Sequence, residues 1–287
     1  YSSGLSITNV SNVEYITLKA GGSYNLTLAD DDTIGNHNGV GEPADGYYLD
    51  ISGESVTTNL TINTAAEAGY VDIAGGSGND TLTGGASYNE LSGHAGNDTL
   101  SAGAGDDLVM GGSGDDTITG GAGADTLVGG TYDYDTGVAT GAGSDTFVYT
   151  NVTDSPFRFS LSGSDIIVGF DSDDQIDLSG MNITNGNYGS ILDKGDTLIF
   201  NEPTRSDFFN SGSADLSVAV GSNGLNGFVL VDVNGNGDLD TNDLAIKLSG
   251  ETTADDFDAV SDFNLPSTGG LIAGLSELAA SQIRPDE

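Results

Sequence analysis

A nine-residue unit repeats six times in succession from residue 75 to residue 128, and this periodicity constrains the fold more than any other feature of the chain. GGSGDDTIT, at residues 111–119, is a typical copy. A flexible linker has no reason to keep an aliphatic residue at every ninth position, so the repeat predicts a folded solenoid. Position six is Asp80, Asn89, Asp98, Asp107, Asp116 and Asp125, and position eight is Leu82, Leu91, Leu100, Val109, Ile118 and Leu127.

Positions seven to nine predict a short strand in which the position-eight side chain points inward and its neighbours point outward. If two units make one coil, each unit stacks about 4.8 Å from the next unit but one. The position-six side chains then meet in pairs along two edges. The expected pairs are Asp80 with Asp98, Asp98 with Asp116, Asp107 with Asp125, and Asn89 with Asp107, where Asn89 is a weaker, neutral ligand.

The chemistry of these pairs favours a hard cation. Glycines at positions one, two and four permit tight turns that direct backbone carbonyl oxygens at a common centre. Carboxylate and carbonyl oxygens in a flexible cage suit Ca²⁺ better than a transition metal. The repeat therefore predicts several Ca²⁺ ions held between stacked coils.

The register becomes irregular after Val128. GGTYDYDTGVA, residues 129–139, is two residues longer than a unit, and TGAGSDTFV, residues 140–148, returns to the pattern with Asp145 at position six. If the longer segment counts as a unit, Asp145 faces Asp125. Asp133 or Asp135 would then complete the site that begins at Asp116.

The repeats resemble the RTX nonapeptide GGxGxDxUx, a calcium-binding repeat of parallel β-helices. SDIIVGFDSDDQIDLSG, residues 164–180, is similar to the segment that follows the repeats in serralysin-type secreted proteins, although Gly169 stands where that family usually has Asp. The resemblance implies an all-β chain: a right-handed parallel β-roll flanked by irregular β-rich segments, with a short helix at the C-terminus. In character the chain is most similar to RTX-type bacterial surface-layer proteins and to the C-terminal part of serralysin-type proteins.

The flanking segments suggest four parts. Residues 1–74 read as an irregular continuation of the solenoid or a small sandwich, 75–148 as the roll, 149–266 as a C-terminal β domain, and 267–287 as a tail with a short helix. Within the third part, DVNGNGDLDTND has the spacing of a calcium loop, but its flanks read as strands, so the loop is expected on a β-hairpin. Its candidate ligands are Asp232, Asn234, Asn236, Asp238, Asp240 and Asp243.

Composition excludes several kinds of partner. The 44 acidic and 6 basic residues give a formal charge of -38, which leaves no basic surface for nucleic acid or anionic lipid. No apolar run approaches the length of a membrane helix, so we expect no membrane insertion. The chain has no cysteine, so Ca²⁺ takes the place of disulfides in this reading. Such an acidic chain should resist compaction until cations bind.

The motifs of common hydrolases and nucleotide-binding enzymes are absent: there is no HExxH, GxSxG or GxxxxGK[ST]. We therefore expect a non-catalytic, secreted structural protein that folds on extracellular Ca²⁺ and self-assembles at the cell surface as a layer, sheath or filament. A surface polysaccharide is a further possible partner. Two alternatives stay open: a C-terminal RTX export and folding module of a secreted enzyme, and part of a large RTX adhesin.

Three outward positions of the repeat are apolar. Leu108, Met110 and Val128 fall on the same face of the even-numbered units, where solvent-facing residues are normally polar. An exposed apolar patch usually marks a contact surface. We expect this face to be covered by the C-terminal β domain or by a neighbouring subunit.

Overall fold

The structure is a computed structural model that describes residues 15–28, 48–133, 138–140, 143–156, 163–171, 173–181, 192–193, 218–222, 226–233, 242–249 and 263–264. The chain forms two compact units, one of Tyr1–Val148 with Asp165–Phe170 and the other of Tyr149–Ser164 with Asp171–Glu287. The described residues include no helix long and apolar enough to cross a membrane. The short helix predicted within 267–287 lies outside the described residues.

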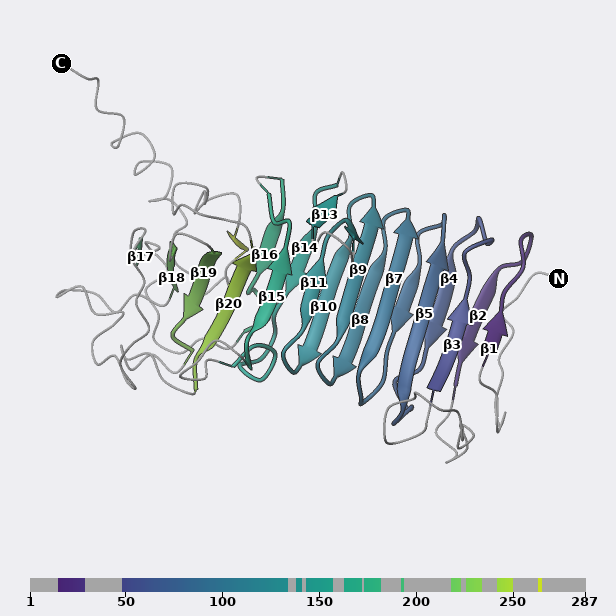
Figure 1. Cartoon of the computed structure of the whole chain (residues 1–287), viewed down its shortest axis with the longest axis horizontal. Coiled ribbons are helices and arrows are strands. Elements are labelled where there is room, and N and C mark those ends of the chain that lie inside the picture. The colour runs from purple at the N-terminus through teal and green to yellow at the C-terminus, as the bar shows by residue number, and fades with distance from the viewer. Residues whose placement is uncertain are drawn as a thin grey trace, which may run out of the picture. The chain divides into compact units, whose positions relative to one another are not determined.

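The first unit is a parallel β-roll, as the repeat predicts. Its strands alternate between two sheets, in the orders β1-β3-β5-β7-β9-β11-β15 and β2-β4-β6-β8-β10-β14, and each strand pairs in parallel with its sheet neighbours. Figure 1 shows these strands stacked side by side. The bounds of the first sheet are β1 Tyr15–Thr17, β3 Tyr48–Ser52, β5 Tyr70–Gly76, β7 Asn89–Ala95, β9 Leu108–Ser113, β11 Thr126–Val128 and β15 Asp165–Val168. Those of the second are β2 Tyr24–Thr27, β4 Leu60–Asn63, β6 Thr81–Thr83, β8 Thr99–Ala104, β10 Thr117–Ala122 and β14 Thr146–Val148.

The position-eight side chains form the core of the roll. Leu82 pairs with Leu100 and Leu100 with Ile118 in one sheet, while Leu91, Val109 and Leu127 pair in the same way in the other. All six are completely buried. The prediction that each unit stacks on the next unit but one is therefore confirmed over the six repeats. Full burial of one such side chain stabilises the fold by about 1.5–3 kcal/mol.

The longer segment after Val128 is a hairpin rather than a unit of the roll. Its strands, β12 Thr131–Asp133 and β13 Val138–Thr140, pair with each other in antiparallel orientation, and neither joins the two parallel sheets. The next strand, β14, pairs directly with β10. The hairpin is thus an insertion within a single unit that begins at Gly129 and ends at Val148.

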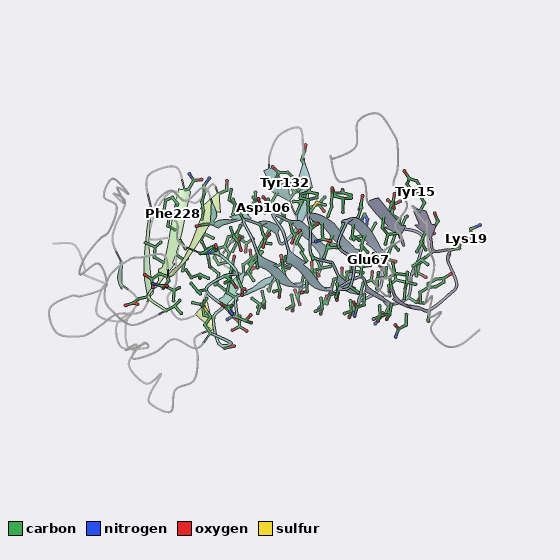
Figure 2. All side chains as sticks on the ribbon, turned by 90° about the horizontal axis from the view of Figure 1, so that it is seen from below. Tyr15, Lys19, Glu67, Asp106, Tyr132 and Phe228 are labelled. Atoms are coloured by element: carbon green, nitrogen blue, oxygen red, sulfur yellow. The ribbon has the colours of Figure 1, made fainter. Side chains whose placement is uncertain are left out.

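This hairpin covers the apolar face predicted from the repeat. Leu108, Met110 and Val128 are buried in a cluster with Val168, and Tyr132 and Ala139 of the hairpin pack against it together with Ile166. Tyr132 is labelled in Figure 2. The expectation that the face is covered is confirmed, and β15 lies within the segment 149–266 that was expected to supply the cover, although it is a strand of the roll. The inserted hairpin β12–β13 is the part of the cover that the sequence does not predict.

The second unit contains an antiparallel sheet in which β18 Val218–Ser222, β19 Asn226–Val231 and β20 Leu244–Ser249 are neighbours. β17 Leu192–Asp193 pairs in parallel with β18, and β16 Gln175–Asp177 pairs in parallel with β21 Phe263–Asn264. Phe228, Val229, Leu230 and Ile246 are buried in this unit. Ser155 is tied to β20, because its hydroxyl donates to the carbonyl of Ala245.

The contribution of this packing to the stability of the roll can be tested by substitution. The double substitution Leu108→Thr and Met110→Thr should lower the stability of the calcium-loaded roll by about 2–4 kcal/mol, because two buried apolar side chains lose their packing under the hairpin. The control is Thr99→Ala with Ser101→Ala, at the same outward positions of the other sheet, which should change stability by less than about 0.5 kcal/mol. Urea unfolding followed by circular dichroism measures both. Equal effects of the two double variants would contradict the packing described.

Candidate metal centre

Four aspartates form a buried ladder along one edge of the roll. The backbone N–H of Asp80 donates to Oδ1 of Asp98 at 2.6 Å, that of Asp98 to Oδ1 of Asp116 at 2.7 Å, and that of Asp116 to Oδ1 of Asp145 at 2.9 Å. All four carboxyl groups belong to residues that are at most 5% exposed. Each carboxylate therefore joins its own coil to the preceding one. The predicted pairs Asp80 with Asp98 and Asp98 with Asp116 are in contact.

A second ladder runs along the opposite edge. The N–H of Asn89 donates to Oδ1 of Asp107 at 2.6 Å, that of Asp107 to Oδ1 of Asp125 at 2.8 Å, and that of Asp125 to Oδ1 of Asp165 at 2.9 Å. These residues are also buried. The structure therefore brings Asn89 to Asp107, and Asp107 to Asp125, as the stacking rule predicts.

The register predicted beyond Asp125 is wrong. Asp145 follows Asp116 rather than facing Asp125, and Asp165 takes the place beside Asp125. The error arises from counting residues 129–139 as a unit. They contain most of an inserted hairpin and contribute no residue to either ladder. Asp133 lies exposed on β12, and Asp145 occupies the position beside Asp116 that the prediction gave to Asp133 or Asp135. Asp135 lies outside the described residues.

Asp165 is the ladder residue that the sequence reasoning missed. It belongs to the segment SDIIVGFDSDDQIDLSG, in which no metal ligand is predicted. A signal was present, because Gly-Ser-Asp at 163–165 repeats Gly-Ser-Asp at 143–145, each followed by three residues that form a strand. The second copy is therefore a degenerate unit in which only the latter half of the pattern is preserved.

Glycine at position one leaves room for the ladder in the third and fifth units, whereas the fourth unit has Ala102 at this position. A Cβ added at Gly93 would lie 2.2 Å from Oδ2 of Asp98 and 2.6 Å from the carbonyl oxygen of Gly111. At Gly111 the corresponding distances are 2.3 Å to Oδ2 of Asp116 and 2.4 Å to the carbonyl oxygen of Gly129. A carboxylate oxygen and a carbonyl oxygen thus converge on the space that any side chain would fill. This is the oxygen chemistry that Ca²⁺ prefers.

The converging carboxylate oxygens lack a protein donor. Oδ2 of Asp98, Asp107 and Asp116 is buried and accepts no hydrogen bond. Leaving a buried carboxylate oxygen without a partner is costly, and a bound cation removes that cost. The residues present therefore fit Ca²⁺, with Asp side chains and backbone carbonyl oxygens as its ligands.

The described residues hold no cluster of three or more His, Cys, Asp or Glu side chains suited to a metal. This agrees with the ladder geometry, in which each coil contributes one carboxylate to each edge. Since Ca²⁺ takes 6–8 oxygen ligands, the remaining ligands of such a site would be backbone carbonyl oxygens and water. A site of this kind is specified by turn geometry as much as by side chains.

The side chains at position five of the repeat also accept hydrogen bonds from the neighbouring coil, but they are exposed to solvent. The N–H of Asn97 donates to Oδ1 of Asn79 at 3.1 Å, and that of Asp115 to Oδ1 of Asn97 at 3.2 Å. Asn79, Asn97 and Asp115 are all exposed to solvent. Positions five and six of the same turn thus carry similar side chains, but position five is exposed and position six is buried. Substitutions at position five can therefore serve as controls for substitutions in the buried ladder.

The second candidate site is described only at its two ends. Asp232 and Asp243 are buried, and the N–H of Val233 donates to Oδ1 of Asp243 at 3.1 Å. The flanking strands β19 and β20 pair through Val231 and Leu244, so the loop closes a β-hairpin as predicted. Asn234, Asn236, Asp238 and Asp240 lie outside the described residues, and calcium at this loop stays a prediction.

Burial dominates the acid–base properties of the ladder. In the absence of a bound cation, desolvation raises the pKa of Asp98 and Asp107 to about 6 each, and that of Asp116 to about 7. Hydrogen bonds from Asn89 to Asp107 and from the backbone of Asp98 to Asp116 oppose the rise in pKa. At Asp116 the charges of Asp145, Asp98 and Asp115 add to it. Burial also raises the pKa of Asp80.

These shifts predict how pH affects the calcium-free roll. Because the pKa values are higher in the folded state than the ordinary value of about 3.9, the folded state binds protons more tightly than the unfolded chain. The resulting stabilisation is complete below pH 4 and is lost as pH rises through about 6 to 7. The melting temperature of calcium-free protein should therefore fall between pH 5 and pH 8. A melting temperature that stays constant or rises over this range, without calcium, would contradict the burial of the ladder.

One family model agrees with this geometry. The model of the RTX calcium-binding nonapeptide repeat (4 copies) matches residues 74–109, 101–131 and 160–180, and the last range includes the degenerate unit at Asp165. No match was found among curated proteins.

Two solved structures from Azotobacter vinelandii, both repeat subunits of the mannuronan C5-epimerase AlgE6, are similar to the chain. The R2 subunit matches with 22% identity, covering 66% of this chain and 94% of that one, at a TM-score of 0.39. The R3 subunit matches with 24% identity, covering 73% and 90%, at a TM-score of 0.25. The family match, together with the two ladders, shows that this chain carries RTX calcium-binding nonapeptide repeats.

Proposed function

We propose that this protein is a secreted, non-catalytic structural protein that folds when it meets extracellular Ca²⁺ and assembles at the cell surface as a layer, sheath or filament. The observation that carries the proposal is the pair of buried aspartate ladders. Stacked carboxylates between coils repel one another and lie away from water, so the roll needs either protons or cations to be stable. At neutral pH, calcium is the chemically suitable partner.

The charge of the whole chain supports the coupling of calcium to folding. A formal charge of -38 opposes compaction, and each bound Ca²⁺ removes about two charges where they are most crowded. Binding to the folded but not the unfolded chain stabilises the fold by mass action. Millimolar calcium outside the cell would therefore act as the folding signal.

The outer face of β6, β8 and β10 supports a role in assembly. Thr81, Thr99 and Thr117 pair along it at position seven, with Thr83, Ser101 and Thr119 at position nine. The outward side chains of this sheet are therefore a regular polar array, suited to contact with a second copy or with a surface polysaccharide. His94, within β7, is exposed and takes the place of a repeat glycine with a φ of 73°.

The proposal predicts a calcium-dependent gain of structure. Protein stripped of metal at pH 7.5 should give a circular dichroism spectrum with a weaker β signal than calcium-loaded protein, and near-millimolar Ca²⁺ should restore the full signal. Magnesium at the same concentration is the control, because its strict octahedral geometry and slow dehydration suit this turn poorly. A chain that is equally folded in excess chelator would overturn the proposal.

Assembly is tested in the same samples by electron microscopy and light scattering. Ordered layers or filaments that appear with calcium and dissolve in chelator are the expected result. A chain that folds with calcium but stays monomeric would instead favour the alternative of a non-catalytic folding or export module of a secreted enzyme. This outcome would remove the assembly part of the proposal and leave calcium binding intact.

The ladder itself is tested by two neighbouring aspartates. Asp116→Asn should weaken calcium binding by about tenfold or more, which corresponds to about 1.4 kcal/mol, because it removes a buried carboxylate placed between two coils. Asp115→Asn makes the same change of charge at the exposed position five and keeps an oxygen for the N–H of Ser144, which now lies 3.0 Å from Oδ1 of Asp115. It should leave the affinity within about twofold, since exposed charges contribute little. Calorimetric titration of both variants with calcium measures the difference, and equal losses would contradict the assignment of position six.

A further inference from the structure

We propose that the side-chain amide of Asn89 takes the place of a calcium ion between two coils, so that the calcium-dependent part of the roll begins C-terminal to it. The inference rests on the proposed calcium function and specifies where along the roll that function starts. It concerns the single unit of the six whose position six is not an aspartate.

The amide nitrogen of Asn89 donates to oxygens of the kind that a cation would bind. Nδ2 donates to Oδ1 of Asp107 at 3.0 Å and to the carbonyl oxygen of Ala102 at 3.2 Å, and it also donates to the carbonyl oxygen of Ser87. Asp107 and Ala102 occupy positions six and one of the next coil on the same edge. A donor with partial positive charge thus stands among three oxygens that would otherwise repel one another.

The aspartate units show the contrast. Beside Gly93, Oδ2 of Asp98 and the carbonyl oxygen of Gly111 converge, and Oδ2 of Asp98 accepts no hydrogen bond. Beside Gly84, the carbonyl oxygen of Ala102 converges with the Asn89 side chain in the same way, but here the amide donates to that carbonyl. The two arrangements differ by an NH₂ group in place of an oxygen. The asparagine amide therefore donates a hydrogen bond to the buried carbonyl oxygen, whereas beside an aspartate a cation would be needed to neutralise the converging oxygens.

The other polar atom of Asn89 is also used. Its Oδ1 accepts the N–H of Gly85 at 3.0 Å, which holds the side chain in the turn. Asp80, at the corresponding end of the opposite ladder, accepts one hydrogen bond at each carboxylate oxygen, from the N–H groups of Leu60 and Gly76, each at 2.7 Å. Both ladders thus start with a side chain whose polar atoms are hydrogen-bonded within the chain.

The coils that precede Asn89 have an apolar core and turns closed by backbone hydrogen bonds. Ile51, Ile62 and Ile73 are completely buried. The turns include bonds from Val56 N–H to the Gly53 carbonyl and from Glu67 N–H to the Thr64 carbonyl. These coils have the features of a fold that forms without metal. They would serve as the template on which calcium-dependent coils add one after another.

The test compares Asn89→Asp with Asn79→Asp in the full chain. Asn89→Asp should bind one more calcium ion per chain than wild type, because it restores an orphan carboxylate beside Asp107. Asn79→Asp makes the same chemical change at exposed position five and should bind the wild-type number. Stoichiometry is measured by calorimetric titration and by atomic absorption after gel filtration.

Hydrogen exchange without calcium supplies the second readout. Wild type should show protection over β3, β5 and β7 and rapid exchange over β9 to β11. Asn89→Asp should lose protection over β7 in chelator and recover it with calcium, whereas Asn89→Ala should lose it and fail to recover it fully. If Asn89→Asp binds no additional calcium, or stays as protected in chelator as wild type, the inference is overturned. If wild type itself binds no calcium, the proposed function fails and the inference fails with it.

Discussion

The contact on which the rest of the roll depends is the hydrogen bond from a backbone N–H of one coil to a buried carboxylate of the next. It repeats at Asp98, Asp116 and Asp145 on one edge and at Asp107, Asp125 and Asp165 on the other. It positions the coils and places one carboxylate at each step. The same contact buries negative charge, so the fold carries its own requirement for protons or cations.

The close approach of oxygen atoms from neighbouring coils also depends on glycine. At Gly93 and Gly111 a single added carbon would strike a carboxylate oxygen and a carbonyl oxygen. Glycine at these two positions therefore allows a carboxylate oxygen and a carbonyl oxygen from neighbouring coils to approach one another with no side chain between them. A calcium ion and a stacked β-roll become parts of one structure, since the ion neutralises the oxygens whose convergence the fold imposes.

Asn89 and the β12–β13 hairpin show how the repeat is modified without being broken. Asn89 keeps the geometry of position six and places an amide donor where Asp98 has a carboxylate oxygen without one. The hairpin adds residues within one unit and covers Met110 and Val128. The strand that follows it, β14, still pairs directly with β10. Changes at turns are tolerated because the ladder and the aliphatic core specify the stacking of coils.

The nine-residue period by itself determined the parallel roll, the inward position of Leu100 and Val109, and the contacts of Asp98 with Asp116 and of Asp107 with Asp125. These follow from local chemistry, because a strand with a period of two and a glycine turn repeat identically in every unit. The tertiary structure alone decided the partners of Asp145 and Asp165. Their register depends on whether residues 129–139 lie in the coil or leave it, and an antiparallel hairpin and a lengthened coil have similar local sequences. What separates them is the burial of Leu108 and Met110 beneath Tyr132, a contact between residues distant in sequence.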